Sequence, residues 1–485
     1  MSRKMVLMKD LIQEITMGPF GSDIKVDNFI EDGVPVLNGS NVAGVKLTEV
    51  SFKYISEEKA KSLKKANTKR GDIVITHRGT LGQISYIPDN SKFDNYIISQ
   101  SQFRVTLKRD LVDPIFFTYY FHSSEGQKRL LSFKNHVGVP ALAQATTNFR
   151  LLEFPYKPLD KQLQIAKVLS DLDAKIELNN KINRELEAMA KTLYDYWFVQ
   201  FDFPNVQGKP YKLSGGKMVY NAELKREIPE GWEVKTISKW IKKDKSGDWG
   251  KETEEVNYQL KVSCVRGADL NGLNGNGELK SPTRFILENN SNKLLENHDL
   301  IVEISGGSPT QSTGRLAFIT EETLQRFPNP LICSNFCKAL TLKEEKYLYN
   351  FVYQWNRIYD KGVLFGWEGK TSGIKNLLFE SFVTNHKDVY PSLKIVEKFY
   401  DFAKPIHSQK QKNLIQNQQL SELRDWLLPM LMNGQVTLRQ AQGNAVKEAK
   451  EKLSSSAELS RSMAAELSRS MAAEPSVEYK TKGNE

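Results

Sequence analysis

The stretch KIELNNKINRELEAMAKTLYDYWF (175–198) decides the fold, because it continues an apolar seam that two asparagines interrupt. Steps of alternately four and three residues mark the seam: Ile165, Leu169, Leu172, Ile176, Asn179, Asn183, Leu186, Ala190, Leu193 and Trp197. This spacing predicts one long helix with about five coiled-coil heptads. A buried asparagine at such a position costs stability but fixes the register and orientation of the partner helix.

The same pattern recurs later in the chain at a constant offset. The second seam reads Phe399, Ala403, Ile406, Lys410, Asn413, Asn417, Leu420, Arg424, Leu427 and Leu431. Segments that precede the helices also correspond. KRGDIVITHRGTLGQISYI (69–87) matches ENHDLIVEISGGSPTQSTGRLAFI (296–319), and MKDLIQEITMGPFGS (8–22) is aligned with GWEVKTISKWIKKDK (231–245). The chain is therefore an internal repeat.

We predict a mixed α/β fold of the α+β class, in which two similar globular domains are separated by two long antiparallel coiled-coil helices. The expected segments are a first globular domain at 1–157, a first helix at 158–200, a linker rich in Pro and Gly at 201–230, a second globular domain at 231–390, a second helix at 391–436, and a low-complexity tail at 437–485, where AELSRSMA occurs twice.

An antiparallel pairing of the two helices brings the four asparagines together. It sets Asn179 opposite Asn417 and Asn183 opposite Asn413, and a slip would leave buried amides unpaired at about 1–3 kcal/mol each. The alternative is a heptad phase that is off by one, with asparagines facing solvent. Two like domains about a pseudo-twofold axis match the geometry of duplex DNA, where half-sites lie about 10 bp apart. Because the domains differ in sequence, such a target is bipartite and asymmetric.

Composition narrows the class of protein. The net charge of +10 favours a polyanionic partner such as nucleic acid, although solvated lysine faces are the alternative. Three cysteines and six histidines form neither a disulfide framework nor a metal site by spacing. No apolar run approaches the roughly 20 residues of a membrane span, so we expect a cytoplasmic protein without membrane contact.

Two near matches to catalytic motifs fail on single residues. EGKTSG (368–373) lacks the glycine that a phosphate loop needs at position 364, where Leu364 stands. DPIF (113–116) has Ile115 where adenine methyltransferases carry a second proline, and it is typical of a helix start. We therefore expect no catalytic residues and no metal ligands on this chain.

Base-reading residues are expected to be polar side chains on loops at comparable positions of both copies. Arginine and lysine pair with guanine, and asparagine or glutamine with adenine. The candidates are Asn38, Ser40, Asn41, Arg78, Gln100 and Gln102 in the first copy, and Arg266, Ser308, Gln311, Lys370 and Ser372 in the second. The alternative for each is an ordinary turn residue.

Aromatic and apolar side chains near the helix ends exceed what a two-helix seam buries. They are candidates for docking partner subunits, with packing on the globular domains as the alternative: Tyr194, Trp197, Phe198, Trp426 and Met430.

Three stretches resemble the specificity subunits of type I restriction-modification enzymes. They are PLDKQLQIAKVLSDLDAKIELNNKINRELEAMAKTLYDYWFVQFD (158–202), IPEGWEVKTI (228–237) and LRDWLLPMLMNGQV (423–436), within a resemblance that covers about residues 5 to 436. The chain departs from the family at PLDKQ, where Pro-Leu-Pro-x-x-Glu-Gln is frequent. The tail has no counterpart in the family pattern.

The resemblance implies a noncatalytic subunit that reads double-stranded DNA, one domain to each half of a bipartite target. It implies helices that dock two modification (methyltransferase) subunits, which methylate adenine N6 with S-adenosylmethionine. Two restriction subunits would use ATP and magnesium to cut unmodified DNA in phage defence, so all cofactors are expected on partners. The competing hypotheses are a coiled-coil scaffold whose domains bind protein and a self-sufficient methyltransferase or nuclease.

Overall fold

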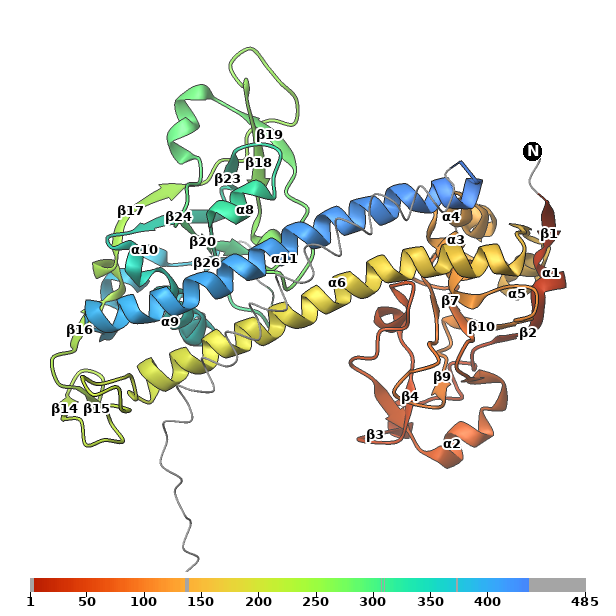
Figure 1. The fold of residues 1–485 in the computed structure, drawn as a ribbon, viewed down its shortest axis with the longest axis horizontal. Helices are drawn as coiled ribbons and strands as arrows, with labels where there is room; N and C mark the ends of the chain where they lie inside the picture. Colours follow the sequence, from red (N-terminus) through yellow and green to blue (C-terminus); the bar gives the residue numbers. More distant parts are fainter. Residues whose placement is uncertain (1–3, 136–138, 307, 309, 372–373, 436–485) are drawn as a thin grey trace, which may run out of the picture. The chain divides into compact units, whose positions relative to one another are not determined.

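Two helices are far longer than the other elements of the computed structural model (Figure 1). The first, α6, spans Leu159–Tyr194 and continues into a π-helical turn at Asp195–Val199. The second, α11, spans Leu393–Asn433 and ends at Gly434, whose positive φ of 69° is typical of a helix C-terminus. The predicted combination of mixed α/β structure with two long helices is confirmed.

The structure describes residues 4–135, 139–306, 308, 310–371 and 374–435. These residues divide into two compact units. Unit 1 takes in the described chain up to Lys175 and from Leu420 onward, and unit 2 is Ile176–Gln419. Each unit thus combines one globular domain with part of α6 and part of α11. The tail at 437–485 lies outside the described residues.

Unit 1 is built on two sheets. The first is antiparallel throughout, in the order β2-β10-β7-β8, and the second has the order β3-β5-β4-β9-β6, in which β4 and β9 are parallel. Their bounds are β2 Ile12–Met17, β3 Phe29–Ile30, β4 Val34–Val36, β5 Lys53–Ile55, β6 Asn67–Thr68, β7 Ile73–Thr76, β8 Ile84–Tyr86, β9 Tyr96–Ile97 and β10 Gln102–Leu107. The aromatic helix α3 (Pro114–His122) packs against β8 of the first sheet, with Asp113 as its N-cap and Pro114 in its first turn.

Unit 2 repeats this architecture. Its four-stranded sheet has the order β17-β24-β20-β22, and its second sheet, β19-β18-β23, again contains one parallel pair, β18 with β23. The bounds are β17 Ile241–Ser246, β18 Leu260–Val265, β19 Thr283–Ile286, β20 Leu300–Glu303, β22 Leu316–Phe318, β23 Leu331–Cys333 and β24 Cys337–Leu342. Both four-stranded sheets carry a register shift near one end of the edge strand, which strengthens the match.

The strand pairing corrects one alignment made from the sequence. Strand β2 corresponds to β17, so the segment 8–22 matches residues about six positions later than 231–245. The reason is the composition of β17, IKKDKS, an edge strand whose solvent side carries charges instead of an alternating apolar pattern. In both units a glycine follows this strand directly, Gly18 in unit 1 and Gly247 in unit 2.

The predicted linker at 201–230 contains structure and packs on unit 2. It holds a hairpin of β14 (Met218–Asn221) and β15 (Arg226–Pro229). Phe203 is buried and stacks on Trp232 with ring centroids 4.9 Å apart. The segment is thus part of the core of unit 2.

The remaining elements complete the two units. Short strand pairs are β1 (Met5–Leu7) with β13 (Glu153–Pro155), β11 (Lys134–Asn135) with β12 (Ala141–Leu142), β16 (Glu233–Thr236) with β27 (Lys387–Tyr390), and the sheet β21 (Ser305–Gly306), β26 (Ile374–Leu377), β25 (Glu368–Thr371). The shorter helices are α1 Met8–Leu11, α2 Glu57–Ser62, α4 Ser124–Leu130, α5 Ala145–Leu151, α7 Leu270–Leu273, α8 Glu321–Gln325, α9 Leu348–Asp360 and α10 Phe379–Asn385. In the part of the chain that the structure describes, no helix combines the length and apolar composition needed to cross a membrane.

Candidate nucleic-acid interface

The asparagines of the two seams meet within unit 2. Asn179 Nδ2 donates to Asn417 Oδ1 at 2.9 Å, and Asn413 Nδ2 donates to Asn183 Oδ1 at 2.8 Å. Asn417 Nδ2 also donates to Asn180 Oδ1 at 2.8 Å. All four seam asparagines are buried, and α6 and α11 run antiparallel through these contacts. The pairs are those expected from the repeat.

Charged seam residues of the second copy are matched by acids on α6. In unit 2 the buried Lys410 lies 2.6 Å from Glu187 Oε2, and in unit 1 Arg424 Nη1 lies 2.7 Å from Asp173 Oδ1. Burial alone would raise the pKa of Glu187, but the Lys410 ammonium and its hydrogen bond lower it to about 2. These ion pairs explain how a less apolar seam packs against the first one.

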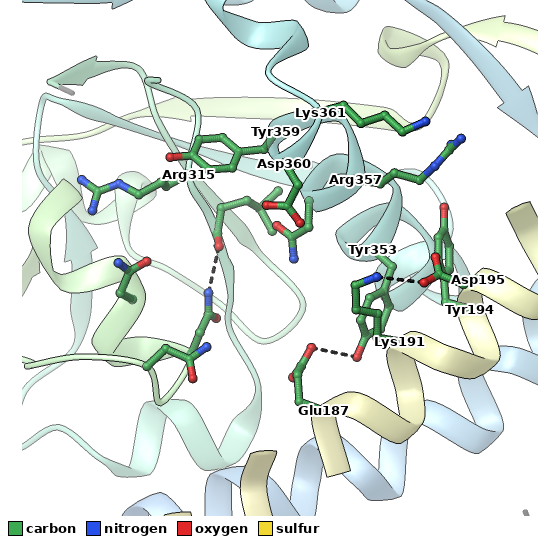
Figure 2. Close-up of a pocket in the computed structure, with 15 residues that line it drawn as sticks. Glu187, Lys191, Tyr194, Asp195, Arg315, Tyr353, Arg357, Tyr359, Asp360 and Lys361 are labelled. Carbon is green, nitrogen blue, oxygen red and sulfur yellow. Dashed lines mark hydrogen bonds and ion pairs between the residues drawn. The ribbon is translucent and has the colours of Figure 1, made fainter. Parts of the chain in front are cut away.

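A polar pocket of about 520 Å³ lies inside unit 2 between α6 and α9 (Figure 2). The Tyr353 hydroxyl donates to Glu187 Oε1 at 3.1 Å on its wall, and Lys191 pairs with Asp195 at 2.8 Å. Buried behind them, His407 Nε2 lies 3.1 Å from the Tyr353 hydroxyl, and burial lowers the pKa of His407 to about 4. Because acids and bases share this wall, the pocket does not have the uniform positive charge of a phosphate site.

A second pocket of unit 2, of about 550 Å³, opens among loops at one end of the four-stranded sheet. We call these loops cluster 2: residues 247–250, 266–269, 305–306 and 334–336. They contribute aromatic, amide and guanidinium groups to one hollow. The lining includes Trp249, Arg266, Glu303, Arg315, Asn335 and Phe336.

Both arginines of this pocket are held by carboxylates. Arg266 donates from Nε and Nη2 to Asp269 at 2.8 and 2.9 Å, and Arg315 donates from Nε and Nη2 to Glu303 at 2.9 and 2.6 Å. Asp269 and Glu303 are almost fully buried, so each guanidinium is fixed in orientation. Because Nε and Nη2 both donate to the carboxylate, Nη1 lies on the opposite side of each guanidinium. Nη1 can therefore donate to a further acceptor.

Unit 1 places corresponding loops at the matching end of its sheet. We call them cluster 1: residues 18–21, 38–41, 77–79 and 99–102. The Asn38 N–H donates to Asn41 Oδ1 at 2.9 Å, just as the Arg266 N–H donates to Asp269 Oδ2 at 3.0 Å. The Thr76 N–H donates to the Gln83 carbonyl at 2.9 Å, and the Glu303 N–H donates to the Arg315 carbonyl at the same distance. At these matching positions one backbone framework carries Asn38 and Asn41 in unit 1 and the charged Arg266 and Asp269 in unit 2.

The candidate base readers of unit 1 divide by exposure. Ser40, Arg78 and Gln100 are exposed on cluster 1. Asn41 is fully buried, and its Nδ2 donates to the carbonyls of Thr48 and Val50, both at 2.8 Å. Gln102 is also fully buried and bonds to the backbone of the neighbouring loops.

Asn38 is half-buried, and its Oδ1 accepts a hydrogen bond from the Ser40 N–H at 2.8 Å. Asn38, Asn41 and Gln102 thus shape the loops of cluster 1 in this conformation, and Ser40, Arg78 and Gln100 are the side chains it presents.

In unit 2 the candidates are more dispersed. Arg266 lines the pocket of cluster 2, whereas Ser308 and the exposed Gln311 form a separate turn, with the Ser308 N–H donating to the Gln311 carbonyl at 3.1 Å. Lys370 lies in β25, paired with Lys375 of β26. Ser372 lies outside the described residues.

The candidate docking side chains also differ in how deeply they are buried. Tyr194 and Phe198 are buried in the core of unit 2, and Trp197 packs against that core, with its ring centroid 6.2 Å from that of Phe399. These three therefore serve the packing of unit 2. In unit 1, Trp426 is 53% exposed and Met430 is half-buried. Trp426 is therefore the candidate docking side chain that is most open to solvent.

Sequence reasoning did not single out Trp249, Glu303, Arg315, Asn335 or Phe336. The correspondence of GPFG (18–21) with GDWG (247–250) could have identified the loop that carries Trp249. It was missed because the segment 8–22 was aligned about six residues too early in the second copy. Among the described residues, no group of three or more His, Cys, Asp or Glu side chains is arranged to hold a metal ion.

Comparisons with known proteins agree on one family. Residues 21–188 match the type I restriction modification DNA specificity domain. The chain is 25% identical over 425 residues to the type I restriction enzyme MjaIX specificity subunit of Methanocaldococcus jannaschii, covering 86% of this chain and 90% of that protein. It is 24% identical over 418 residues to the HindI specificity subunit of Haemophilus influenzae, covering 76% and 87%.

Among solved structures, the S subunit of a type I restriction-modification system from M. genitalium aligns with a TM-score of 0.49 at 16% identity. That alignment covers 89% of this chain and 96% of that one. Over most of its length the chain is thus similar to type I restriction enzyme specificity subunits.

Proposed function

We propose that this chain is the sequence-reading subunit of a type I restriction-modification complex and that it binds double-stranded DNA through clusters 1 and 2. The observation that carries the proposal is the repetition of one sheet and one set of loops, with unlike side chains at matching positions. Like folds suit the two halves of a split target, and unlike side chains suit two different half-sites. The target is therefore bipartite and asymmetric.

The candidate readers follow from exposure and chemistry. In cluster 1, Ser40, Arg78 and Gln100 are the open polar groups, and the glutamine has the donor and acceptor pair that fits adenine. In unit 2, Arg266 has the chemistry that fits guanine, and Gln311 is exposed on its own turn. Lys370 stays a candidate from its place in β25.

The long helices are proposed to set the gap between the half-sites. The buried pairs Asn179–Asn417 and Asn183–Asn413 support a fixed register of α6 against α11. A register that cannot slip gives one gap length, which we expect to be about 10 bp between half-site centres.

The chain is proposed to be noncatalytic and to act in the cytoplasm with other subunits. The partners are two modification subunits, which would methylate adenine with S-adenosylmethionine, and two restriction subunits, which would use ATP and magnesium. The exposed Trp426 and its neighbour Met430 are the docking candidates that remain outside the core of unit 2.

The proposal is tested by co-expressing the chain with its modification subunit and mapping adenine methylation across the host genome. We expect one split motif, with two unlike short halves around a fixed gap. Specific binding that weakens with salt is a second expected result, because phosphate contacts release counterions. If the complex forms and binds its methyl donor but DNA stays unmethylated, a coiled-coil scaffold with protein-binding domains becomes the better account.

A further inference from the structure

Each unit exposes one aromatic ring at the same point of its fold. Phe20 lies three residues after the end of β2 and is 83% exposed, and Trp249 lies three residues after the end of β17 and is 36% exposed. Large apolar side chains on loops usually turn inward, because exposing them forfeits the gain of burial. The recurrence in both copies therefore calls for a ligand.

The loops that carry these rings are tightly built. A Cβ at Gly18 would lie 2.0 Å from the Ser99 carbonyl oxygen, and one at Gly247 would lie 1.9 Å from that of Ser334. Only glycine lets each loop pass this close to the loop before β10 or β24. Because Gly18 and Gly247 make the same close approach in their units, Phe20 and Trp249 follow at equivalent positions of the two backbones.

Local contacts hold the backbone at Phe20 and one face of the Trp249 ring. The Phe20 N–H donates to Asp23 Oδ2 and the Asp23 N–H donates to the Phe20 carbonyl, both at 2.9 Å. The Arg284 guanidinium lies 4.0 Å from the Trp249 ring centre and covers one of its faces. The Phe20 loop is thus held at its backbone, and the Trp249 ring is held by Arg284.

The surroundings of the rings have the chemistry of a nucleobase site. Trp249 shares its pocket with Arg266, Arg315 and Asn335, so hydrogen-bonding groups surround a flat apolar face. In unit 1, a Cβ at Gly21 would lie 2.5 Å from Gln100 Oε1, which sets the Phe20 loop against the exposed amide of Gln100. A nucleobase offers the complementary combination of a flat face and a polar edge.

We propose that Phe20 and Trp249 are base-stacking residues, each inserted against an opened base step of the half-site that its own unit reads. Base faces in a duplex are covered by their neighbours, so a ring reaches one only where a step is unstacked or a base is extruded. The inference rests on the proposed DNA-reading function. It adds two specificity-determining positions and a deformation of the DNA at each half-site.

The test uses the chain in complex with its modification subunit and a duplex that carries the mapped split site. Phe20→Ala and Trp249→Ala remove the rings, whereas Phe20→Tyr and Trp249→Phe keep an aromatic ring. Leu151→Ala in unit 1 and Leu213→Ala in unit 2 are matched controls, because both leucines are exposed and lie outside the clusters. Thermal unfolding of every variant verifies that its fold is intact.

Two readouts follow each variant. The first is the dissociation constant for the duplex, and the second is 2-aminopurine fluorescence with the probe stepped through both half-sites. We expect each alanine variant to lose about 5- to 150-fold in affinity, the equivalent of one base-aromatic stack. Each alanine variant should lose the 2-aminopurine signal of unstacking in one half-site only, and Phe20→Ala and Trp249→Ala should affect different half-sites. Phe20→Tyr and Trp249→Phe should retain the signal. An unpaired base at the opened step strengthens binding by the unsubstituted chain more than binding by the alanine variant, because only the ring gains from a step that is already open.

Other outcomes overturn the inference. If folded alanine variants bind and unstack DNA like the leucine controls, the rings do not stack on bases, even though a methylated split motif still supports the reading function. If they keep DNA affinity but release the modification subunit on gel filtration, the rings are protein contacts. Absence of any split motif refutes the proposed function itself, a result that these variants do not affect.

Discussion

The Asn183–Asn413 hydrogen bond gives a direct test of the helix register. Its two side chains are buried in unit 2, and Asn413 Nδ2 donates to Asn183 Oδ1 at 2.8 Å. Asn413→Leu removes that donor and leaves a buried carbonyl without it, and Asn183→Leu strands the amide on the opposite helix. The double variant removes both polar groups and places two leucines across the seam.

The expected magnitude comes from the stranded group. A buried donor or acceptor that loses its partner costs about 1–3 kcal/mol, whereas replacing both partners with apolar groups is nearly neutral. Any gain from burying a leucine appears equally in the single and double variants and cancels in the cycle. We therefore expect the double variant to be more stable than the sum of the singles by about 1–3 kcal/mol.

Urea unfolding followed by tryptophan fluorescence measures this coupling for unit 2. The chain has seven tryptophans, and all except Trp426 lie in unit 2, so a Trp426→Phe background confines the signal to that unit. Pairing Asn183→Leu with the exposed Leu213→Ala provides an additive control, because distant sites add within about 0.5 kcal/mol.

Additive single effects, with a coupling below about 0.5 kcal/mol, refute the claim that these asparagines act as a pair. The functional readout is independent of stability. If the asparagines fix register, the double variant bound to its modification subunit methylates sites with more than one gap length. A single unchanged gap in a folded double variant shows that other contacts set the register.

Three further predictions test other parts of the molecule. Burial lowers the pKa of His407 to about 4, below its unfolded value of about 6.5, so the unfolded state binds the proton first as pH falls. The free energy of unfolding of unit 2, measured with urea, should then fall by about 3 kcal/mol between pH 6.5 and pH 4. His407→Phe should make that free energy depend less on pH. Gly247→Ala should lower the free energy of unfolding of unit 2 by about 1–3 kcal/mol, because the added Cβ meets the Ser334 carbonyl oxygen. Gly366→Ala has open space around it and should change the same free energy by no more than about 0.5 kcal/mol. Trp426→Ala should weaken binding of the modification subunit about 30-fold by titration calorimetry, without changing the unfolding temperature.

Helix packing was predictable from the sequence because it is set by backbone periodicity. The seam positions from Ile165 to Leu193 are buried or half-buried, and so are those from Phe399 to Leu431. Which residues face the partner follows from spacing alone, and the repeated asparagines identified that partner. The pairing of Lys410 with Glu187 was not predictable, because Glu187 lies beside the seam and its contact depends on the packing of side chains.

The candidate site was harder to predict because a polar loop residue has two uses that look alike in sequence. Asn41 and Ser40 are neighbours in one short turn, yet Asn41 is buried and bonds to backbone carbonyls while Ser40 is exposed. Which of the two faces outward depends on the three-dimensional course of residues 48–50. No local pattern contains that information.

The largest error of alignment fell on the segment that carries Phe20 and Trp249. Strands β2 and β17 share hydrogen bonding and a following glycine, but their side chains differ because both are edge strands with an exposed side. A reader of two unlike half-sites keeps its backbone frame in both copies and changes the side chains that project from it. Similarity between the copies is therefore weakest around the loops proposed to read DNA, and the frame there becomes recognisable only from strand register and from glycines that admit no side chain.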